Sequence, residues 1–176
     1  MPPLLIVCGP PGAGKSLLVG VLSRELELPV ISKDSVKEAI MDHAGGGPEI
    51  GAAAFAVQFA IARELLRSDV GLILEGAFFR TQTELADLAR AARPAIIELS
   101  CEIAELERRY VARIDARHPG HRGLEALPDL RERVATGQYT PALDCPRLGV
   151  DTSDGLDPSE DQIVEWARRA TAAPGR

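Results

Sequence analysis

The sequence predicts an α/β fold in which helices cover both faces of a parallel sheet. Short apolar runs recur along the chain, and segments with apolar residues at helical spacing separate them. Parallel strands need a crossover connection of this kind, whereas a hairpin needs only a short turn. The length of 176 residues suits one domain with a single core. We expect that domain over residues 1–173, followed by a disordered tail at residues 174–176.

The first expected strand is residues 4–8, LLIVC, an apolar run that ends at glycine and proline as a buried strand should. Further strands are expected at residues 29–32, 70–75, 94–100 and 147–153. Helices are expected over residues 15–27, 36–43, 50–67, 82–92, 103–117, 128–137 and 159–172. A GGGP breaker at residues 45–48 separates the second helix from the third. Because parallel strands place their carboxyl ends at one edge of the sheet, we expect the functional site there.

The composition narrows the class of protein. A net charge of −6 provides no broad cationic surface, so we expect no binding of long nucleic acid. The three cysteines, Cys8, Cys101 and Cys145, form no CxxC pair, as is typical of free thiols in a reducing cytosol. No apolar run reaches the roughly 18 residues of a membrane helix. We therefore expect a soluble cytoplasmic protein, monomeric or dimeric, that does not bind membranes.

A glycine-rich motif follows the first strand. Residues 9–16, GPPGAGKS, fit G-x-x-x-x-G-K-S between a strand and a helix, which is the context of a P-loop. Small residues at Gly12 and Gly14 let backbone N–H groups converge on phosphates, and the helix N-terminus adds positive potential. Lys15 would reach the terminal phosphates, and the Ser16 hydroxyl would ligate Mg²⁺. The predicted nucleotide-binding residues of this loop are Gly9, Pro10, Pro11, Gly12, Ala13, Gly14, Lys15, Ser16 and Leu17.

Other features separate the classes of nucleotide-using protein. The chain contains no asparagine, which excludes the Asn-Lys-x-Asp motif with which Ras-like GTPases recognise guanine. A motor or AAA-type ATPase would need a longer chain and adjacent acids after a strand, whereas LILEGAF supplies only Glu75. Glu75 is a candidate to hold Mg²⁺ through water or to orient substrate; the alternative is a surface acid after a strand. Arg80 is either a substrate contact or a solvated charge.

The chain has only three lysines, because most of its basic residues are arginine, and two of the three flank one aspartate. In SKDSVKE, Lys33 and Lys37 lie on either side of Asp34. Ser35 and Glu38 fit an S-x-x-E capping box, which would leave Asp34 free of a capping role. A carboxylate between two cations would stay ionised and could accept a proton from an attacking hydroxyl. Asp34 is therefore a candidate general base, and the alternative is that it caps the helix.

The stretch LLIVCGPPGAGKSLLVGVLSRELELPVISKDSVKEAI resembles the P-loop kinase group that contains polynucleotide kinase, chloramphenicol phosphotransferase, zeta toxins and gluconate kinase. In that group an aspartate just after the second strand binds and deprotonates the substrate hydroxyl, which implies this role for Asp34. KDSVK is similar to the Arg-Asp-x-x-Arg pattern of polynucleotide kinases. The resemblance implies a three-layer P-loop NTPase fold with a five-stranded parallel sheet in the order 2-3-1-4-5 and a small helical lid. Glu75 stands where the group more often has aspartate.

An arginine-rich stretch, residues 105–123, places Arg109, Arg113 and Arg117 four residues apart, so one helix would carry them as a stripe. In kinases of this group the lid supplies arginines that close over the ATP phosphates, which implies a lid at about residues 114–130. The resemblance then implies nucleotide contacts for Arg109 and Arg113, and we expect Arg113 and Arg117 to contact the phosphates. HPGH, residues 118–121, fits a mobile tip. The alternative is a solvated face on which Glu105 pairs with Arg109.

These features together predict a kinase that uses ATP and Mg²⁺ and transfers the γ-phosphate to a hydroxyl of a small molecule. The expected catalytic residues are Lys15, Asp34, Arg113 and Arg117. Substrate contacts are expected from Lys33, Asp34, Lys37, Glu75 and Arg80, and metal contacts from Ser16 and Glu75. The four phenylalanines, Phe55, Phe59, Phe78 and Phe79, either line an apolar acceptor pocket or pack in the core. Two other functions stay open: a polynucleotide 5′-hydroxyl or nucleotide-sugar kinase, and an ATP-binding regulator without phosphoryl transfer.

Overall fold

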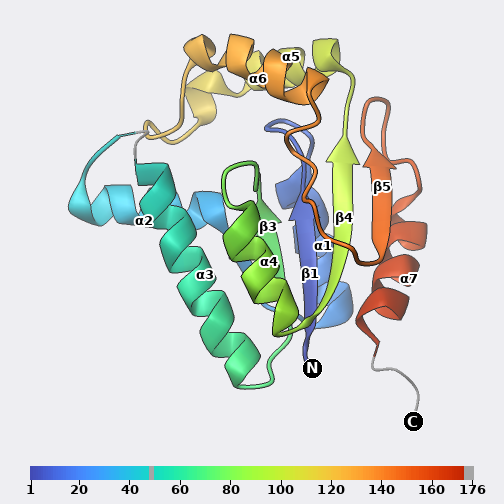
Figure 1. Ribbon diagram of the computed structural model, residues 1–176. Coiled ribbons are helices and arrows are strands. Elements are labelled where there is room, and N and C mark those ends of the chain that lie inside the picture. Colours follow the sequence, from blue (N-terminus) through green and yellow to red (C-terminus); the bar gives the residue numbers. More distant parts are fainter. Residues whose placement is uncertain (48–49, 173–176) are drawn as a thin grey trace.

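The computed structural model describes residues 1–47 and 50–172, which form a sheet of five parallel strands with helices around it (Figure 1). The strands are β1 (Pro3–Cys8), β2 (Val30–Ser32), β3 (Leu72–Gly76), β4 (Arg93–Ser100) and β5 (Arg147–Asp151). Their order in the sheet is β2-β3-β1-β4-β5, which confirms the order that the resemblance implies. The expected disordered tail at residues 174–176, and Pro48 of the expected breaker, lie outside the described residues.

Helices cover both faces of the sheet, and a further group crosses the carboxyl ends of the strands (Figure 1). One face carries α1 (Lys15–Leu26) and α7 (Glu160–Thr171), and the other carries α3 (Gly51–Arg67) and α4 (Gln82–Arg90). The remaining helix before α3 is α2 (Lys33–Ala44). Across the carboxyl ends lie α5 (Ile103–Ala112), the 3₁₀ turns η2 (Ile114–Ala116) and η3 (Leu124–Ala126), and α6 (Leu127–Ala135). None of the helices within residues 1–47 and 50–172 combines the length and apolar character of a membrane span.

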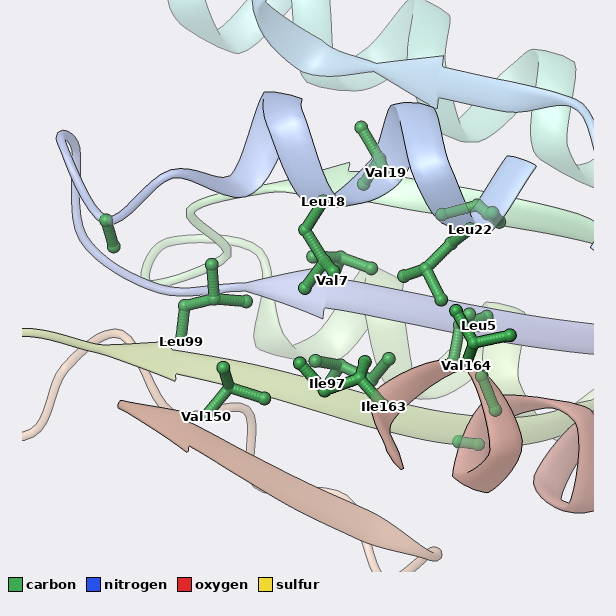
Figure 2. Close-up of a cluster of buried hydrophobic side chains, with 14 of the residues drawn as sticks. Leu5, Val7, Leu18, Val19, Leu22, Ile97, Leu99, Val150, Ile163 and Val164 are labelled. Atoms are coloured by element: carbon green, nitrogen blue, oxygen red, sulfur yellow. The ribbon is translucent and has the colours of Figure 1, made fainter. Parts of the chain in front are cut away.

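The central strand β1 packs on both faces, which explains its nearly continuous apolar sequence. Leu5 and Val7 share one buried cluster with side chains of α1 and α7, shown in Figure 2. Leu4 and Ile6 belong to the cluster on the opposite face, with side chains of α3 and α4. Successive strand residues point to opposite faces, so a strand covered on both sides has no solvated position. This burial anchors the start of the P-loop.

The expected capping box at Ser35 is wrong, because the second helix begins earlier. α2 starts at Lys33, and its N-cap residue is Ser32 in an extended conformation. The strand β2 is only three residues long, and the Ser32 hydroxyl donates to Glu75 Oε2 at 2.5 Å instead of capping the helix. Asp34 therefore lies in the first turn of α2, where the helix dipole favours a carboxylate.

The expected arginine stripe is also wrong, because the helix that should carry it ends at Ala112. Arg113 is the C-cap residue, a single 3₁₀ turn follows, and Arg117 has extended backbone with φ −83° and ψ 150°. The residue before a proline is driven out of the helical region, so the chain ahead of Pro119 could not continue as one helix. The arginines at positions 109, 113 and 117 therefore occupy three different local structures.

The stretch that follows α5, residues 113–139, is held to the rest of the chain by a small third cluster. Tyr110, Leu130 and Tyr139 are buried together, and Phe79 from the loop after β3 packs against them. The Tyr110 hydroxyl also donates to the carbonyl of Arg122 at 2.7 Å. We call residues 113–139 the cover segment, because it crosses the carboxyl ends of the strands (Figure 1).

Candidate active site

A cavity of about 730 Å³ lies at the carboxyl ends of the sheet, on the β2 and β3 side of the P-loop. Its walls come from the P-loop, the starts of α1 and α2, one face of α3, the loop after β3, and α5 with the cover segment. Strands β4 and β5 and the loops directly after them contribute none of the described lining residues. The cavity therefore spans the site expected for phosphates and the region next to it where an acceptor would lie.

The P-loop has the geometry that phosphate binding requires. Gly12 and Gly14 have φ angles of 91° and 82°, a region that only glycine adopts readily. Helix α1 begins after Gly14 without a side-chain cap and without an acidic residue in its first turn, so its positive end is not neutralised locally. Of the predicted loop residues, Gly9, Pro10 and Ala13 are buried and the others line the cavity.

Lys15 lies across this loop. Its Nζ donates to the carbonyl oxygens of Gly9 and Pro10 at 3.1 and 3.0 Å. Burial lowers the pKa of Lys15, although the negative charges of Glu75 and Asp34 oppose the shift. Both carboxylates therefore lie close enough to interact with the ammonium group.

Glu75 is buried at 3% exposure, so its interpretation as a surface acid is wrong. In the sheet it is level with Val7 of β1 and with Ser32 of β2, directly beside the start of the P-loop. Its carboxylate accepts a hydrogen bond from the Ser32 hydroxyl, and it lines the cavity together with Ser16. A hydroxyl and a carboxylate are oxygen donors of the kind that Mg²⁺ prefers, so the residues present fit this metal.

Asp34 projects from the first turn of α2 into the same cavity. Lys33 Nζ lies 2.9 Å from Asp34 Oδ1, and the Asp34 side chain is 51% exposed. Loss of hydration acts to raise the pKa of the carboxyl, but the charge and hydrogen bond of Lys33 outweigh it, with help from His121 and Lys15. The pKa of Asp34 therefore lies below its usual value, and the group is ionised at neutral pH.

Lys37, the second lysine of the pair, has a partner that the sequence did not suggest. It lines the cavity but is only 4% exposed, and its Nζ donates to the carbonyl of Gly120 at 2.7 Å. Gly120 belongs to HPGH and lies so close to α2 that an added Cβ would be 2.0 Å from Met41 Sδ. This part of the cover segment is thus docked on the helix that carries Asp34.

Two histidines extend this contact between the cover segment and α2. His121 Nε2 lies 2.7 Å from Glu38 Oε1, and His118 Nε2 lies 2.9 Å from Asp42 Oδ1. The backbone N–H of Gly120 donates to His118 Nδ1 at 3.1 Å, so the proton of a neutral His118 ring lies on Nε2 and is donated to Asp42. The histidines therefore act as hydrogen-bond partners for one face of α2.

We expect the double variant Glu38→Ala and Asp42→Ala to loosen the cover segment. Each lost hydrogen bond is worth about 0.5–1.5 kcal/mol, so losing both costs about 1–3 kcal/mol, and amide hydrogen exchange at residues 118 and 120–123 should be roughly 5- to 150-fold faster. Asp87→Ala is the control, because Asp87 pairs with Arg90 on the exposed side of α4. Unchanged exchange in the double variant would show that the histidine contacts do not hold the segment.

The arginines of the expected stripe divide between two places. Arg109 pairs with Glu105 at 2.6 Å, as the alternative hypothesis predicted, and also donates to the carbonyl of Thr152 at 2.6 Å. It joins α5 to the end of β5 and does not line the cavity. Arg113 and Arg117 do line it, and the guanidinium of Arg117 lies 4.5 Å from the ring centroid of Tyr110.

The cavity has further basic residues that the sequence analysis missed. Arg80, for which a substrate contact is predicted, lines it, and Arg63, Arg122 and Arg133 line it from α3 and the cover segment. Arg63 follows Phe59 by four residues, so helical spacing could have placed it on the same face. No local pattern distinguishes Arg133 from its neighbours in α6.

The four phenylalanines lie partly in the cavity wall and partly in the core. Phe55, Phe59 and Phe78 form one aromatic group with ring centroids 5.8 to 6.2 Å apart. Phe55, Phe59 and Phe79 line the cavity, whereas Phe78 is fully buried beneath it. This side of the cavity therefore has an aromatic wall supported by the core.

The comparisons with known proteins agree with this architecture. A family model described as an AAA domain matches residues 4–136. A candidate kinase from Chloroflexus aurantiacus j-10-fl is 32% identical, with a TM-score of 0.85 over 97% of this chain and 99% of that chain. No curated protein matches the chain.

Two less similar structures share the fold. A gluconokinase from Sinorhizobium meliloti 1021 is 18% identical, with a TM-score of 0.65 over 97% of this chain and 94% of that one. A shikimate kinase from Acinetobacter baumannii, solved in complex with shikimate, is 18% identical, with a TM-score of 0.60 over 94% and 89%. The chain therefore belongs to the AAA domain family and to its group of small P-loop kinases.

Proposed function

We propose that the protein is an ATP- and Mg²⁺-dependent kinase that transfers the γ-phosphate of ATP to a hydroxyl of a small molecule. The observation that supports this most strongly is that one cavity is lined by Lys15 and Ser16 of the P-loop, Asp34 of α2 and Glu75 of β3. These are the groups that phosphoryl transfer requires: cations for the phosphates, oxygen ligands for a metal, and a base for the nucleophile.

In this proposal the P-loop amides and Lys15 hold the β- and γ-phosphates. Ser16 and Glu75 would hold Mg²⁺, Glu75 through water, and the bound ion would supply positive charge against the phosphate oxygens. Lys15 already donates to two loop carbonyls, so the loop presents its ammonium group close to the phosphate site. Arg117 lies near enough to Lys15 that its charge contributes to lowering the lysine pKa.

Asp34 would act on the acceptor. Its ionised carboxylate accepts a hydrogen bond from the acceptor hydroxyl and takes the proton as the oxygen attacks the γ-phosphorus. A bond forms between the acceptor oxygen and the γ-phosphorus, the bond to the β,γ-bridging oxygen breaks, and ADP leaves. Arg113 and Arg117 would neutralise charge on the phosphoryl group during this step.

Transfer of label from [γ-³²P]ATP tests the proposal. Pools of hydroxylated metabolites are offered with Mg²⁺, and a 5′-hydroxyl oligonucleotide is offered separately; we expect labelled product only from small molecules. The cavity supports this expectation, because α5 and the cover segment contribute to its walls and Lys37 and two histidines dock that segment on α2. Labelling of the oligonucleotide would favour the polynucleotide kinase alternative. Tight ATP binding with no labelled product from any pool would favour the regulator.

A further inference from the structure

We infer that the acceptor carries an anionic group, a carboxylate or a phosphate ester, which Arg80 and Arg133 bind beside Phe79. This inference rests on the proposed function, because it assigns the acceptor to the same cavity. Arg80, Arg133, Phe79 and Thr81 together are called the anion pocket below.

The charge of the cavity differs in sign from that of the whole chain. Its lining includes nine basic residues, which are Lys15, Lys33, Lys37, Arg63, Arg80, Arg113, Arg117, Arg122 and Arg133. Only three carboxylates line it, which are Asp34, Glu75 and Glu84. The protein as a whole carries a net charge of −6, so the positive charge is concentrated at this site. Binding of the ATP phosphates explains the basic residues nearest the P-loop, but it does not explain Arg80 and Arg133.

The anion pocket lies on the acceptor side of the cavity. Arg80 and Phe79 follow the end of β3, and β3 pairs with β2, the strand that leads into Asp34. Arg133 reaches the pocket from α6 of the cover segment. An anion bound by both arginines would therefore join the core of the protein to the segment that covers the site.

The two guanidinium groups share one aromatic ring. The guanidinium carbon of Arg133 lies 4.4 Å from the ring centroid of Phe79, and that of Arg80 lies 5.3 Å from it. A guanidinium held over a ring keeps its N–H donors available for a planar carboxylate or a phosphate. The edge of Tyr139 contacts the same ring, with centroids 5.8 Å apart, and Tyr139 is buried. The ring that organises the arginines is thus itself fixed in place.

Charge pairing within the protein does not use up these donors. Among residues 1–47 and 50–172, Arg80 forms no ion pair, and Arg133 has one carboxylate partner, Asp129 at 3.5 Å. Asp129 has a shorter contact with Arg122, at 2.6 Å. By comparison, Arg131 on the same helix as Arg133 is paired through two nitrogens with Glu107. Arg80 and Arg133 therefore retain more binding capacity for an anion than Arg131, which lies outside the cavity.

A second, independent observation comes from Thr81. Its Oγ1 is buried and has no hydrogen-bond partner among the described residues, although Thr81 lines the cavity next to Arg80. Buried hydroxyl groups are nearly always hydrogen-bonded to protein or to ordered water, so this hydroxyl marks an unmet hydrogen bond at the cavity wall beside Arg80. A ligand oxygen beside Arg80 would supply that partner after the Thr81 side chain turns toward the cavity. Glu84 lines the cavity one turn further along α4 and can accept a hydrogen bond from a substrate hydroxyl but not hold the anion.

The test measures anion binding with the nucleotide site filled. The protein is saturated with AMP-PNP and Mg²⁺, so that the γ-phosphate position is occupied, and is titrated with D-glycerate, glycerol 3-phosphate, inorganic phosphate or glycerol while its melting temperature is followed. We expect saturable stabilisation by at least one anion and none by glycerol. The glycerate and phosphate arms distinguish a carboxylate site from a phosphate site.

Variants then locate the binding site. Arg80→Ala and Arg133→Ala should each weaken binding of the stabilising anion at least tenfold, since each removes charge-assisted hydrogen bonds. Arg90→Ala on α4 and Arg131→Ala on α6 are the matched controls, because both arginines are exposed and lie outside the cavity. Unchanged affinity for AMP-PNP in all four variants shows that each is folded.

The inference fails if no anion stabilises the wild-type complex, if glycerol stabilises it equally, or if both cavity variants bind the anion as tightly as the controls do. The proposed function can survive that failure, because labelled phosphate could still be transferred to a neutral acceptor. Conversely, anion binding that depends on Arg80 and Arg133, without transfer to any acceptor, would overturn the kinase proposal and keep the anion pocket.

Discussion

Asp34→Asn should lower the rate of phosphoryl transfer by about 10²- to 10⁴-fold, the usual contribution of a positioned general base. The amide of asparagine keeps the size of the side chain but cannot take the proton of the attacking hydroxyl. It also loses the ion pair with Lys33, which lies 2.9 Å away in the wild-type protein. Binding of ATP should change little, because in the proposed mechanism the P-loop amides and Lys15, and not Asp34, hold the phosphates.

The measurement is steady-state ATP consumption with a labelled acceptor, together with the affinity for ATP in its absence. Asp87→Asn provides the control, because Asp87 is an exposed aspartate of α4 outside the cavity. Turnover equal to that of the wild type would reject Asp34 as the base. If the variant also lost affinity for ATP, Asp34 would instead contribute to nucleotide binding.

Gly9→Ala should destabilise the fold by about 3–5 kcal/mol, which is at the upper end for a single substitution. Gly9 has φ 139°, and a Cβ at this position would lie 2.4 Å from the carbonyl oxygen of Leu99. Leu99 belongs to β4, which is hydrogen-bonded to β1, so neither backbone can move aside without breaking the sheet. Alanine would therefore meet an unfavourable backbone conformation and a steric clash together.

Urea unfolding followed by circular dichroism measures this loss. Gly20→Ala is a matched control, because Gly20 lies in the middle of α1, has no positive φ, and has no atom within 4 Å of an added Cβ. The control should gain about 0.5–1 kcal/mol through the better helix propensity of alanine. Equal unfolding midpoints for Gly9→Ala and the wild type would contradict the close approach of the P-loop to β4.

The fold and the phosphate loop could be predicted because both depend on residues that are neighbours along the chain. The apolar runs match all five strands to within two residues at each end, and the helical periodicities locate the helices between them. GPPGAGKS could be recognised as a P-loop, because its glycines, Lys15 and Ser16 lie within residues 9–16. Asp34 could be singled out for the same reason, since its flanking lysines are close in sequence.

The start of α2 and the burial of Glu75 could not be predicted, because both depend on contacts between distant segments. S-x-x-E suggested a helix starting after Ser35, but the pairing of Ser32 with Glu75 across the sheet starts it at Lys33. Glu75 is likewise buried at the end of β3, where it accepts a hydrogen bond from Ser32. The local sequence did not decide whether Glu75 lies on the surface or in the site.

The sequence by itself thus determined the α/β architecture, the P-loop and the pairing of Asp34 with lysine. Hydrophobic periodicity and short sequence motifs depend only on residues that are close along the chain. Only the tertiary structure decided that Lys37 docks the cover segment and that Arg133, but not Arg131, reaches the cavity. The physical reason is that packing of a helix places some of its side chains in the cavity and leaves others in solvent. The orientation of α6 over Phe79 is set by the buried cluster of Tyr110, Leu130 and Tyr139, whose members meet only in the folded chain.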